Sequence, residues 1–485
     1  MSTRASTGNL LRTLTEDEVE RIHQGSMRTL EEIGIVIDHG EIRDLLAQAG
    51  CQIDPASGLT KFPPKLVDEA VARAPSEVLL CGRDGAHDMR VGDGKLYARV
   101  PGGAPGILDL ETRSWRPPLK QDVADIARVA DALHHINGVS MFPVVPSDVP
   151  IEVVDVHAAE AAFRHTSKHL FYVCHNIALI DHVIEMAVAV AGDEEALQRR
   201  PLVSVLAEAT APLRLVEDQL RVLMAFAKRG LPLMLHSHPI AGLTSPVTLA
   251  GELVLTNAEI LSLVVIAQLI RPGTPVVYGM SSSVPDMRST LNLAGAVEIG
   301  LLGAAVAQIA KRYGLPCAMT SGIDAKVPDA QAALDRLLTM LPPVLAGINL
   351  VNISTTDTKL TFCLEQLVID NEILAAVRRY LQGIQVDDET LALDLMAQVG
   401  PGGAFIATGH TVRHHRRELL MSKLLSREPR SVWEQDGSKD TWERAGEMVR
   451  RILEEHQPLP LSEEAGQQIA AIVGEVERRT PGAGC

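Results

Sequence analysis

The sequence predicts an α/β fold: a (β/α)8 barrel of the TIM type that carries an N-terminal α+β appendage and C-terminal helices. Short apolar runs alternate with longer helical patterns from about residue 120 to about residue 425, as in repeated βα units on a parallel sheet. Eight such runs suit a closed barrel, because open doubly wound sheets usually stop at about five to seven strands. With 485 residues, 46% of them apolar, the chain can bury one large core.

The eight strands are expected at 138–145, 169–175, 201–208, 231–238, 274–280, 315–321, 348–354 and 404–410. Between two of them, Ser245 and Pro246 begin a helix that Pro272 and Gly273 end. The helix expected at 291–313 has apolar and small residues on nearly every side, so it needs cover on two faces. An interface between copies would supply the second cover, and we therefore expect a homo-oligomer.

The chain is expected to divide into three parts. Residues 1–118 form the appendage, in which 15–50 and 63–74 read as helices and 77–116 as short strands with a turn at Asp93 and Gly94. Residues 119–425 form the barrel. Residues 426–485 form a helical extension that packs on the outside of the barrel.

The composition excludes several classes of protein. A net charge of −16 argues against nucleic acid and against an anionic membrane surface, since both need clustered cations. The six cysteines include no C-x-x-C pair, and the N-terminus has no apolar signal segment, so we expect a cytoplasmic protein. The apolar run 247–270 is interrupted by Glu252, Asn257 and Glu259, which favours a buried helix over a membrane span.

Polar side chains follow most of the expected strands, where barrel enzymes of this type place their chemistry. Both signs of charge occur among them, so the set could bind a small zwitterion or could form an ordinary solvated rim. These residues are Asp148, His175, Asn176, Glu208, His236, His238, Asp286, Arg288, Asp324, Lys326, Asp329, Asp357, Lys359 and His410.

His236 and His238 form the one pattern that suggests a metal. Two histidines at i and i+2 at the end of a strand point to the same side and can share an ion. Metal-dependent hydrolase barrels place such a pair on the first strand, whereas here it lies on the fourth expected strand. We therefore expect no metal, and the pair is interpreted as substrate-binding or structural.

Three segments resemble the trimethylamine methyltransferase superfamily: GLTSPVTLAGELVLTNAEILSLVVIAQLIRPGTPVVYG (242–279), SGIDAKVPDAQAA (321–333) and GIQVDDETLALDLMAQVGPGGAFIATGHTVRHHR (383–416). The likeness extends from about residue 30 to residue 455. The resemblance implies a (β/α)8 barrel that moves a methyl group from a methylated amine to the Co(I) of a separate corrinoid protein.

Members of this family that use trimethylamine carry pyrrolysine near the sixth strand, whereas 321–329 contains only ordinary residues. The chain thus resembles the non-pyrrolysine branch, the glycine betaine:corrinoid methyltransferases, whose substrates are quaternary amines. No D-x-H-x-x-G corrinoid signature occurs, and the nearest string, 155–160, lacks the glycine. Cobalamin is therefore expected on a partner protein, with no cofactor bound tightly by this chain.

Positioning a cation needs aromatic faces or carboxylates, and a substrate carboxylate needs donors. No catalytic residue is assigned, and core packing is the alternative for each aromatic. The candidate substrate-binding residues are Phe142, Tyr172, Asn176, Glu208, His236, His238, Tyr278, Arg288, Asp324, Lys326, Asp357 and His410. Two other functions stay open: a metal-dependent hydrolase or lyase that uses His236 and His238, and a non-catalytic binder of methylated amines.

Overall fold

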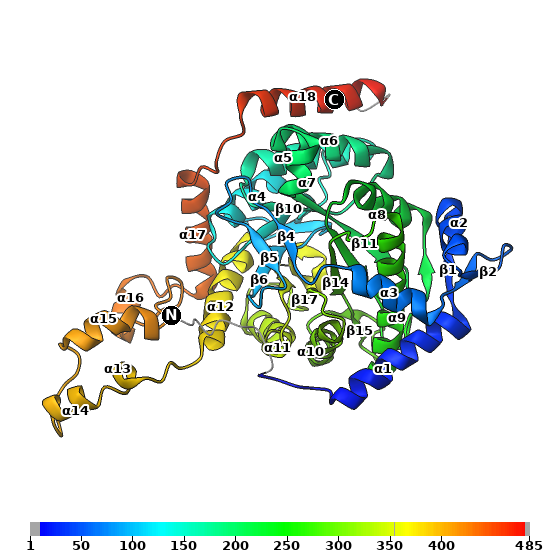
Figure 1. Cartoon of the computed structure of the whole chain (residues 1–485). Coiled ribbons are helices and arrows are strands. Elements are labelled where there is room, and N and C mark those ends of the chain that lie inside the picture. Colours follow the sequence, from blue (N-terminus) through cyan, green and yellow to red (C-terminus); the bar gives the residue numbers. More distant parts are fainter. Residues whose placement is uncertain (1–9, 354, 481–485) are drawn as a thin grey trace.

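The computed structural model describes residues 10–353 and 355–480, and its centre is a closed barrel of eight parallel strands (Figure 1). Each strand of the barrel is followed by a helix on the outside, which confirms the (β/α)8 class. In order around the barrel, the strands are β6 (Tyr97–Val100), β9 (Gly138–Ser140), β10 (His169–Tyr172), β11 (Val203–Ala209), β13 (Leu233–Ser237), β14 (Val276–Met280), β17 (Cys317–Thr320) and β18 (Leu350–Asn352).

The helices that follow these strands are α4 (Lys120–Ala132), α5 (Val154–His165), α6 (Ile180–Ala191), α8 (Glu217–Arg229), α9 (Leu249–Ile270), α10 (Val297–Arg312), α11 (Ala330–Ala346) and α12 (Leu364–Gln382). Two short elements, η2 (Ile177–Leu179) and α7 (Glu194–Arg199), flank α6. The helix α9 is long and apolar enough to cross a membrane by length and composition alone. It is mostly buried, however, between the barrel and the N-terminal helices.

Seven of the eight expected strands are present, and the eighth prediction is wrong. Residues 401–407 are exposed and lead into the helix α15 (Gly409–Glu418), so no barrel strand forms at 404–410. The remaining strand is β6, which comes first in the chain and pairs in parallel with both β18 and β9. It therefore lies in the segment expected to be an appendage. Counted from β6, His236 lies on the fifth barrel strand and His238 just after it.

A β-hairpin closes the N-terminal end of the barrel. Strands β4 (Val78–Leu80) and β5 (Met89–Val91) pair antiparallel, and their apolar side chains form one buried cluster with residues inside the barrel. The members from the barrel strands are Tyr97, Phe171, Met234, Val277, Ala318 and Leu350. The barrel interior therefore has an apolar floor, and chemistry is restricted to its opposite end.

The rest of the N-terminal part packs on one flank of the barrel. It consists of α1 (Glu16–Arg28), η1 (Thr29–Ile33), β1 (Ile35–Ile37), α2 (Gly40–Gln48), β2 (Gln52–Ile53), β3 (Leu59–Lys61) and α3 (Pro64–Arg73). The three strands join β12 (Arg214–Leu215) in a small sheet, and α1 and α3 pack against α9.

Two small sheets belong to the loops that follow the barrel strands. One joins β7 (Gly106–Leu108), β8 (Trp115–Arg116), β19 (Thr355–Thr356) and β20 (Thr361–Phe362). The other pairs β15 (Val284–Pro285) with β16 (Asn292–Leu293). The turn η3 (Asp357–Lys359) connects β19 to β20. These loops form the rim of the open end, which we call the mouth.

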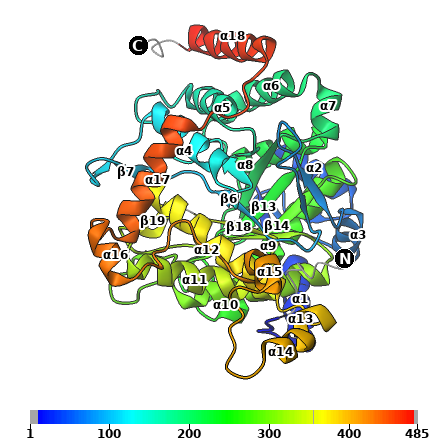
Figure 2. The same cartoon turned by 90° about the vertical axis from the view of Figure 1, so that its left-hand side faces the viewer.

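The C-terminal part contains an extended segment and two packed helices. The helices α13 (Asp388–Leu391), α14 (Leu393–Val399), α15 and α16 (Arg430–Gln435) bury none of their residues. Figure 1 shows residues 384–421, which we call the arm, projecting from the flank beyond α12. The helix α17 (Thr441–Glu455) packs on α12 and α4, and α18 (Glu463–Arg479) on α5 and α6 (Figure 2). The three-part division into domains stays a prediction.

Candidate active site

Alternate residues of the barrel strands point into the barrel interior, because successive side chains in a strand point to opposite faces. At the mouth these inward positions form a polar layer above the apolar floor. Strand register places Glu208, His236 and Gly279 side by side on neighbouring strands, and likewise Thr320, Asn352 and Arg99. We call this layer the lumen site.

Arg99 is the cation of the lumen site, and only 2% of it is exposed. Its Nε donates to Asn352 Oδ1, and its Cζ lies 4.4 Å from the ring centre of Phe171. Its Nη1 has no hydrogen-bond partner among the described residues. Burial lowers the pKa of Arg99 to about 10, against the opposing effect of the Glu208 carboxylate. Arg99 therefore stays protonated at neutral pH with one donor unused.

A chain of hydrogen bonds fixes the side chains next to Arg99. Asn352 Nδ2 donates to Thr320 Oγ1 at 2.9 Å, and the hydroxyls of Thr320 and Ser281 are bonded to each other. The chain crosses β6, β18 and β17 and reaches the end of β14. Because each member is bonded to the next, the guanidinium of Arg99 is held in one orientation.

Glu208 is the anion of the lumen site. Its Oε2 lies 3.1 Å from Nδ1 of His238, whereas its buried Oε1 has no hydrogen-bond partner in the described part of the chain. Burial alone raises the pKa of Glu208, but His238, His236 and Lys359 outweigh burial and bring it to about 2. The carboxylate is therefore ionised at every pH at which the protein is expected to work.

His236 lies between these charges and is neutral. Only 1% of it is exposed, and neither ring nitrogen has a hydrogen-bond partner within residues 10–353 and 355–480. Burial lowers its pKa to about 3, and the positive charge of Arg99 acts in the same direction. A neutral imidazole offers one N–H donor and one acceptor without adding charge.

Lys359 stands on a strained turn at the mouth. Asp357, Thr358 and Lys359 have φ values of 49°, 55° and 71°, which is three consecutive non-glycine residues in the left-handed region. Such backbone costs free energy and is often found at functional sites. Burial lowers the pKa of Lys359 to about 8, while Glu208 and Asp324 oppose the shift. The turn thus places a titratable cation near Glu208.

Phe142 and His175 supply an aromatic face after β9 and β10. Phe142 is fully buried, and its ring centre lies 4.3 Å from that of the half-buried His175. Ring faces of this kind attract quaternary ammonium groups. The ring centre of Phe142 also lies 6.5 Å from that of Tyr172. A role of Phe142 in binding stays a prediction.

The other two candidate aromatics point away from the lumen. Tyr172 donates its hydroxyl to Asp155 on α5, and Tyr278 donates to Asn257 on α9 at 3.0 Å. Both side chains therefore fill the layer between strands and helices. The apolar runs of fully buried parallel strands show no alternation, so the inward positions could not be identified from the sequence.

Asp324, Lys326 and Asp357 hold the loops of the mouth together. The carboxylate of Asp324 accepts hydrogen bonds from the N–H groups of Ala294 and Gly295, at 2.7 and 3.0 Å. Lys326 Nζ lies 2.6 Å from Asp357 Oδ1, and the lysine side chain is 68% exposed. These contacts hold the loops of the rim together. They also engage the charged groups that were expected to bind substrate.

Asn176, Arg288 and His410 do not join the lumen site either. Asn176 caps the short turn η2 through its side-chain oxygen. The side chain of Arg288 is 92% exposed and pairs with Asp286. His410 lies on α15 in the arm, with Nε2 3.3 Å from the carbonyl of Glu389. It is far in the fold from the strand end at which it was expected, because 404–410 is not a strand.

His236 and His238 are not arranged as a pair. Their ring centres lie 6.4 Å apart with planes at 69°, and His238 is turned toward Glu208. Within the described residues, no group of three or more His, Cys, Asp or Glu side chains could hold a metal ion. His238 contacts Glu208, whereas neither ring nitrogen of His236 has a hydrogen-bond partner among the described residues.

Arg99 is the residue that sequence reasoning missed. It stands in YARV, just before the glycine loop PGGAPG, and was interpreted as part of an appendage hairpin. A short apolar strand followed by a glycine-rich loop was a signal for a barrel strand end. Lys359 was noted among the polar residues at strand ends but was not included among the candidate substrate-binding residues.

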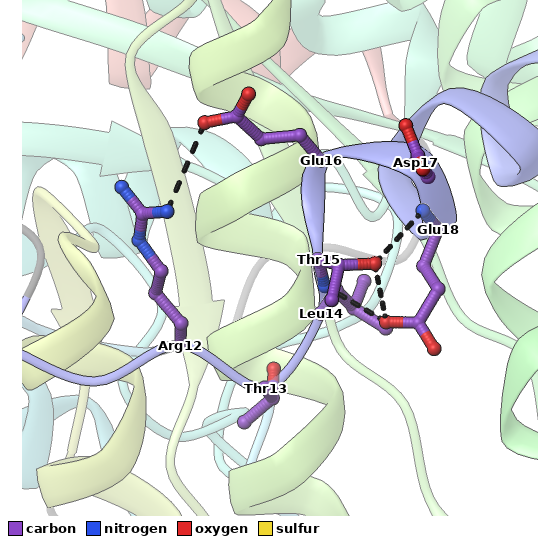
Figure 3. A pocket seen from close by; sticks show the side chains of 7 residues that line it. All are labelled: Arg12, Thr13, Leu14, Thr15, Glu16, Asp17 and Glu18. Atoms are coloured by element: carbon purple, nitrogen blue, oxygen red, sulfur yellow. Dashed lines mark hydrogen bonds and ion pairs between the residues drawn. The ribbon is translucent and has the colours of Figure 1, made fainter.

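A hollow at the start of α1 is structural. Figure 3 shows Thr15 and Glu18 bonded in a capping box and Arg12 directed at Glu16, 3.7 Å away. The backbone of Thr13 and Leu14 is bonded to the side chain of Gln308 on α10. The hollow therefore marks where the N-terminal segment is fastened to the barrel.

Comparison with known proteins gives a consistent family. A model described as trimethylamine methyltransferase (MTTB) matches residues 3–481. Trimethylamine methyltransferase MttB of Desulfitobacterium hafniense (strain DSM 10664 / DCB-2) is 36% identical, over 96% of this chain and 93% of that protein. Trimethylamine methyltransferase MttB of Methanosarcina barkeri is 34% identical over 98% and 97%, and glycine betaine methyltransferase of Desulfitobacterium hafniense (strain Y51) is 30% identical over 95% and 96%.

Among solved structures, the monomethylamine methyltransferase MtmB of Methanosarcina barkeri aligns with 98% of this chain and 96% of its own. The TM-score is 0.44 and the sequence identity 11%.

Proposed function

We propose that this chain, which belongs to the trimethylamine methyltransferase family, moves a methyl group from a quaternary amine of the betaine type to Co(I) of a corrinoid carried by a separate protein. That it is a methyltransferase, as the sequence resemblance implied, is confirmed by the family. The observation that supports the substrate is the lumen site: an ionised carboxylate, a buried guanidinium and a neutral imidazole at the open end of a barrel whose floor is apolar.

The chemistry requires positioning more than proton transfer. The nitrogen–methyl bond breaks, its electron pair stays on nitrogen, and the product leaves as a neutral tertiary amine. The Co(I) of the partner supplies the electron pair for the new bond to the methyl carbon. The protein has to hold the cation still with one methyl group facing the mouth. Glu208 stays ionised and His236 neutral, so neither has to change its charge during transfer.

The rim of the mouth suits a docked protein. Large apolar side chains are exposed on loops that follow five different barrel strands, and exposed apolar groups of this density often mark interaction sites. They are Trp115 (57%), Ile151 (54%), Leu243 (61%), Met287 (79%) and Leu360 (53%). The proposed occupant is the corrinoid-carrying protein, because the rim surrounds the end of the barrel at which Glu208 and His238 are partly exposed.

Aspartate substitutions at the rim separate docking from chemistry. Met287→Asp and Leu360→Asp should lose transfer to the protein-bound corrinoid and keep transfer to free cobalamin. The matched control is Ile33→Asp, on a similarly exposed apolar residue of the N-terminal flank. Equal loss with both acceptors would contradict docking at this rim.

The arm supports the predicted homo-oligomer. Ile384, Ile406 and Met421 are 80%, 80% and 70% exposed, and the arm helices bury nothing within one chain. The helix α15 is strongly basic in a chain whose net charge is −16, so a second copy offers an acidic surface for it. Sedimentation of the whole protein should give a multimer that Ile406→Asp with Met421→Asp dissociates. A monomeric mass for the unchanged chain would refute this proposal.

A cytoplasmic location likewise stays our prediction.

The test of the function is direct. The protein is mixed with Co(I) cobalamin and a panel of quaternary amines, and the spectrum of methylated cobalamin is followed. Appearance of that spectrum with a betaine, and its loss in Glu208→Gln, would support the proposal. Silence of the whole panel with folded protein would overturn it.

A further inference from the structure

We propose that the lumen site fixes the polarity of its substrate: Arg99 receives a carboxylate at the inner end, and Glu208 faces a quaternary ammonium at the outer end. The inference rests on the proposed function and deepens it, since it limits the substrate class to N-methylated zwitterions and makes Arg99 the residue that selects them. A methylated amine without a carboxylate would leave Arg99 unpaired.

The first support is the state of the two charges. The Glu208 carboxylate acts on Arg99 across the lumen and opposes the fall in its pKa, yet no ion pair joins the two among the described residues. Each keeps one buried atom without a hydrogen-bond partner, Nη1 on Arg99 and Oε1 on Glu208. Buried polar atoms are nearly always satisfied, and an unsatisfied charged group is costly. A zwitterion placed between them, with its carboxylate toward Arg99, would give Nη1 an acceptor and would place a compensating positive charge beside the Glu208 carboxylate.

The second support is the difference in chemistry between the two ends. A guanidinium with a free N–H is a strong donor for a carboxylate. A quaternary ammonium has no N–H group, so it interacts with the Glu208 carboxylate through charge alone and donates no hydrogen bond to Oε1. His236 stands between the two with an N–H donor and without charge, which suits the carboxylate.

The third support fixes the direction. Arg99 is 2% exposed and lies over Phe171, a member of the apolar floor cluster. The side chain of Glu208 is 23% exposed and its partner His238 is 40% exposed, so this end is nearer to solvent. The anion of the substrate therefore lies inside and its methyl groups face the mouth, from which the acceptor approaches.

Three probes of nearly equal shape test the assignment. Glycine betaine carries both charges, 3,3-dimethylbutyrate is its carbon analogue with the carboxylate alone, and choline carries the ammonium without a carboxylate. Binding of each to the whole protein is measured by calorimetry. The unchanged protein should bind glycine betaine at least about tenfold more tightly than either of the other two.

Substitutions at the two ends should have opposite effects. Arg99→Met should weaken glycine betaine and 3,3-dimethylbutyrate at least about tenfold and leave choline unchanged. Glu208→Gln should weaken glycine betaine and choline and tighten 3,3-dimethylbutyrate. The matched control is Arg288→Met, an arginine at the same mouth whose side chain is 92% exposed and should affect none of the three.

Arg99→Lys keeps the positive charge and replaces Arg99→Met in the test if that variant does not fold. It should retain part of the preference for the two probes that carry a carboxylate. Unchanged binding of glycine betaine in both Arg99 variants would overturn the inference, as would equal binding of choline and betaine by the unchanged protein. These readouts need no acceptor, so binding with the expected polarity but without methyl transfer would overturn only the proposed function.

Discussion

The ring of His236 occupies the space that the missing side chain of Gly279 leaves on the neighbouring strand. A Cβ atom at Gly279 would lie 2.0 Å from Cδ2 and 2.1 Å from Nε2 of His236. Strand register brings the two residues side by side. Glycine is therefore required at 279 by the position of the imidazole rather than by a special backbone conformation.

Gly279→Ala is expected to push His236 out of place. Because the displaced imidazole can no longer offer its donor, binding of glycine betaine should fall at least about tenfold. Calorimetry of the folded variant measures the change. Gly40→Ala is the control, since a Cβ there meets nothing within 4 Å. Unchanged affinity in Gly279→Ala would show that the position of His236 is unimportant.

Binding of the cation is expected to depend on Lys359. With a pKa of about 8, this lysine is charged below that pH and partly cancels the attraction of Glu208 for a second cation. Affinity for choline should therefore rise by up to about tenfold between pH 7 and pH 9. Lys359→Met should bind tightly at both pH values, whereas Lys326→Met should keep the dependence. A flat profile in the unchanged protein would contradict this role.

Two buried carboxyl groups on α9 should make stability depend on pH. Burial raises the pKa of Glu252 and of Glu259 to about 7, although hydrogen bonds from Ser282 and Ser237 oppose it. Their unfolded pKa is about 4.3, so the folded state binds more protons and loses stability as pH rises through about 7.

Glu259→Gln should match the unchanged protein near pH 4 and exceed its stability at pH 8 by up to about 4 kcal/mol. Urea unfolding at the two pH values measures the difference. Glu194→Gln, at the exposed start of α7, provides the control. An equal effect of Glu259→Gln at both pH values would show that this carboxyl group is not protonated in the folded state.

Tyr278→Phe is expected to cost stability without affecting binding. The change leaves Oδ1 of the buried Asn257 without its donor, which should lower the free energy of unfolding by about 1–3 kcal/mol. Glycine betaine should bind as before, because the ring lies outside the lumen. Chemical unfolding and calorimetry test the two statements separately, and a large loss of affinity would contradict the outward placement.

The sequence predicted the barrel well because seven of its strands are continuous apolar runs separated by helices. The family resemblance that it carried is confirmed. The strand β6 escaped detection because it lies beside a hairpin turn in the segment interpreted as an appendage, and Arg99 was missed with it.

The candidate residues were harder to predict than the fold. Glu208 and His236 were chosen because they are polar and end apolar runs, and the strand register brings them side by side. Their role in binding stays a prediction. Tyr172 and Tyr278 were expected in the site, but their side chains point away from the lumen. In a strand buried on both faces, only the strand register shows which side chains point inward. Asp324 and Lys326 are charged and follow a barrel strand, as the prediction required. Their side chains, however, are engaged in contacts between the loops of the mouth.

The hairpin of β4 and β5 closes one end of the barrel, so the lumen has a single entrance, at the mouth. A substrate that enters by the mouth has to leave by it, and a docked acceptor would cover that passage. If the proposed acceptor docks at the mouth, the amine has to bind before the acceptor, and the demethylated product can leave only after it. Steady-state kinetics would register this order as inhibition by excess acceptor that more amine relieves.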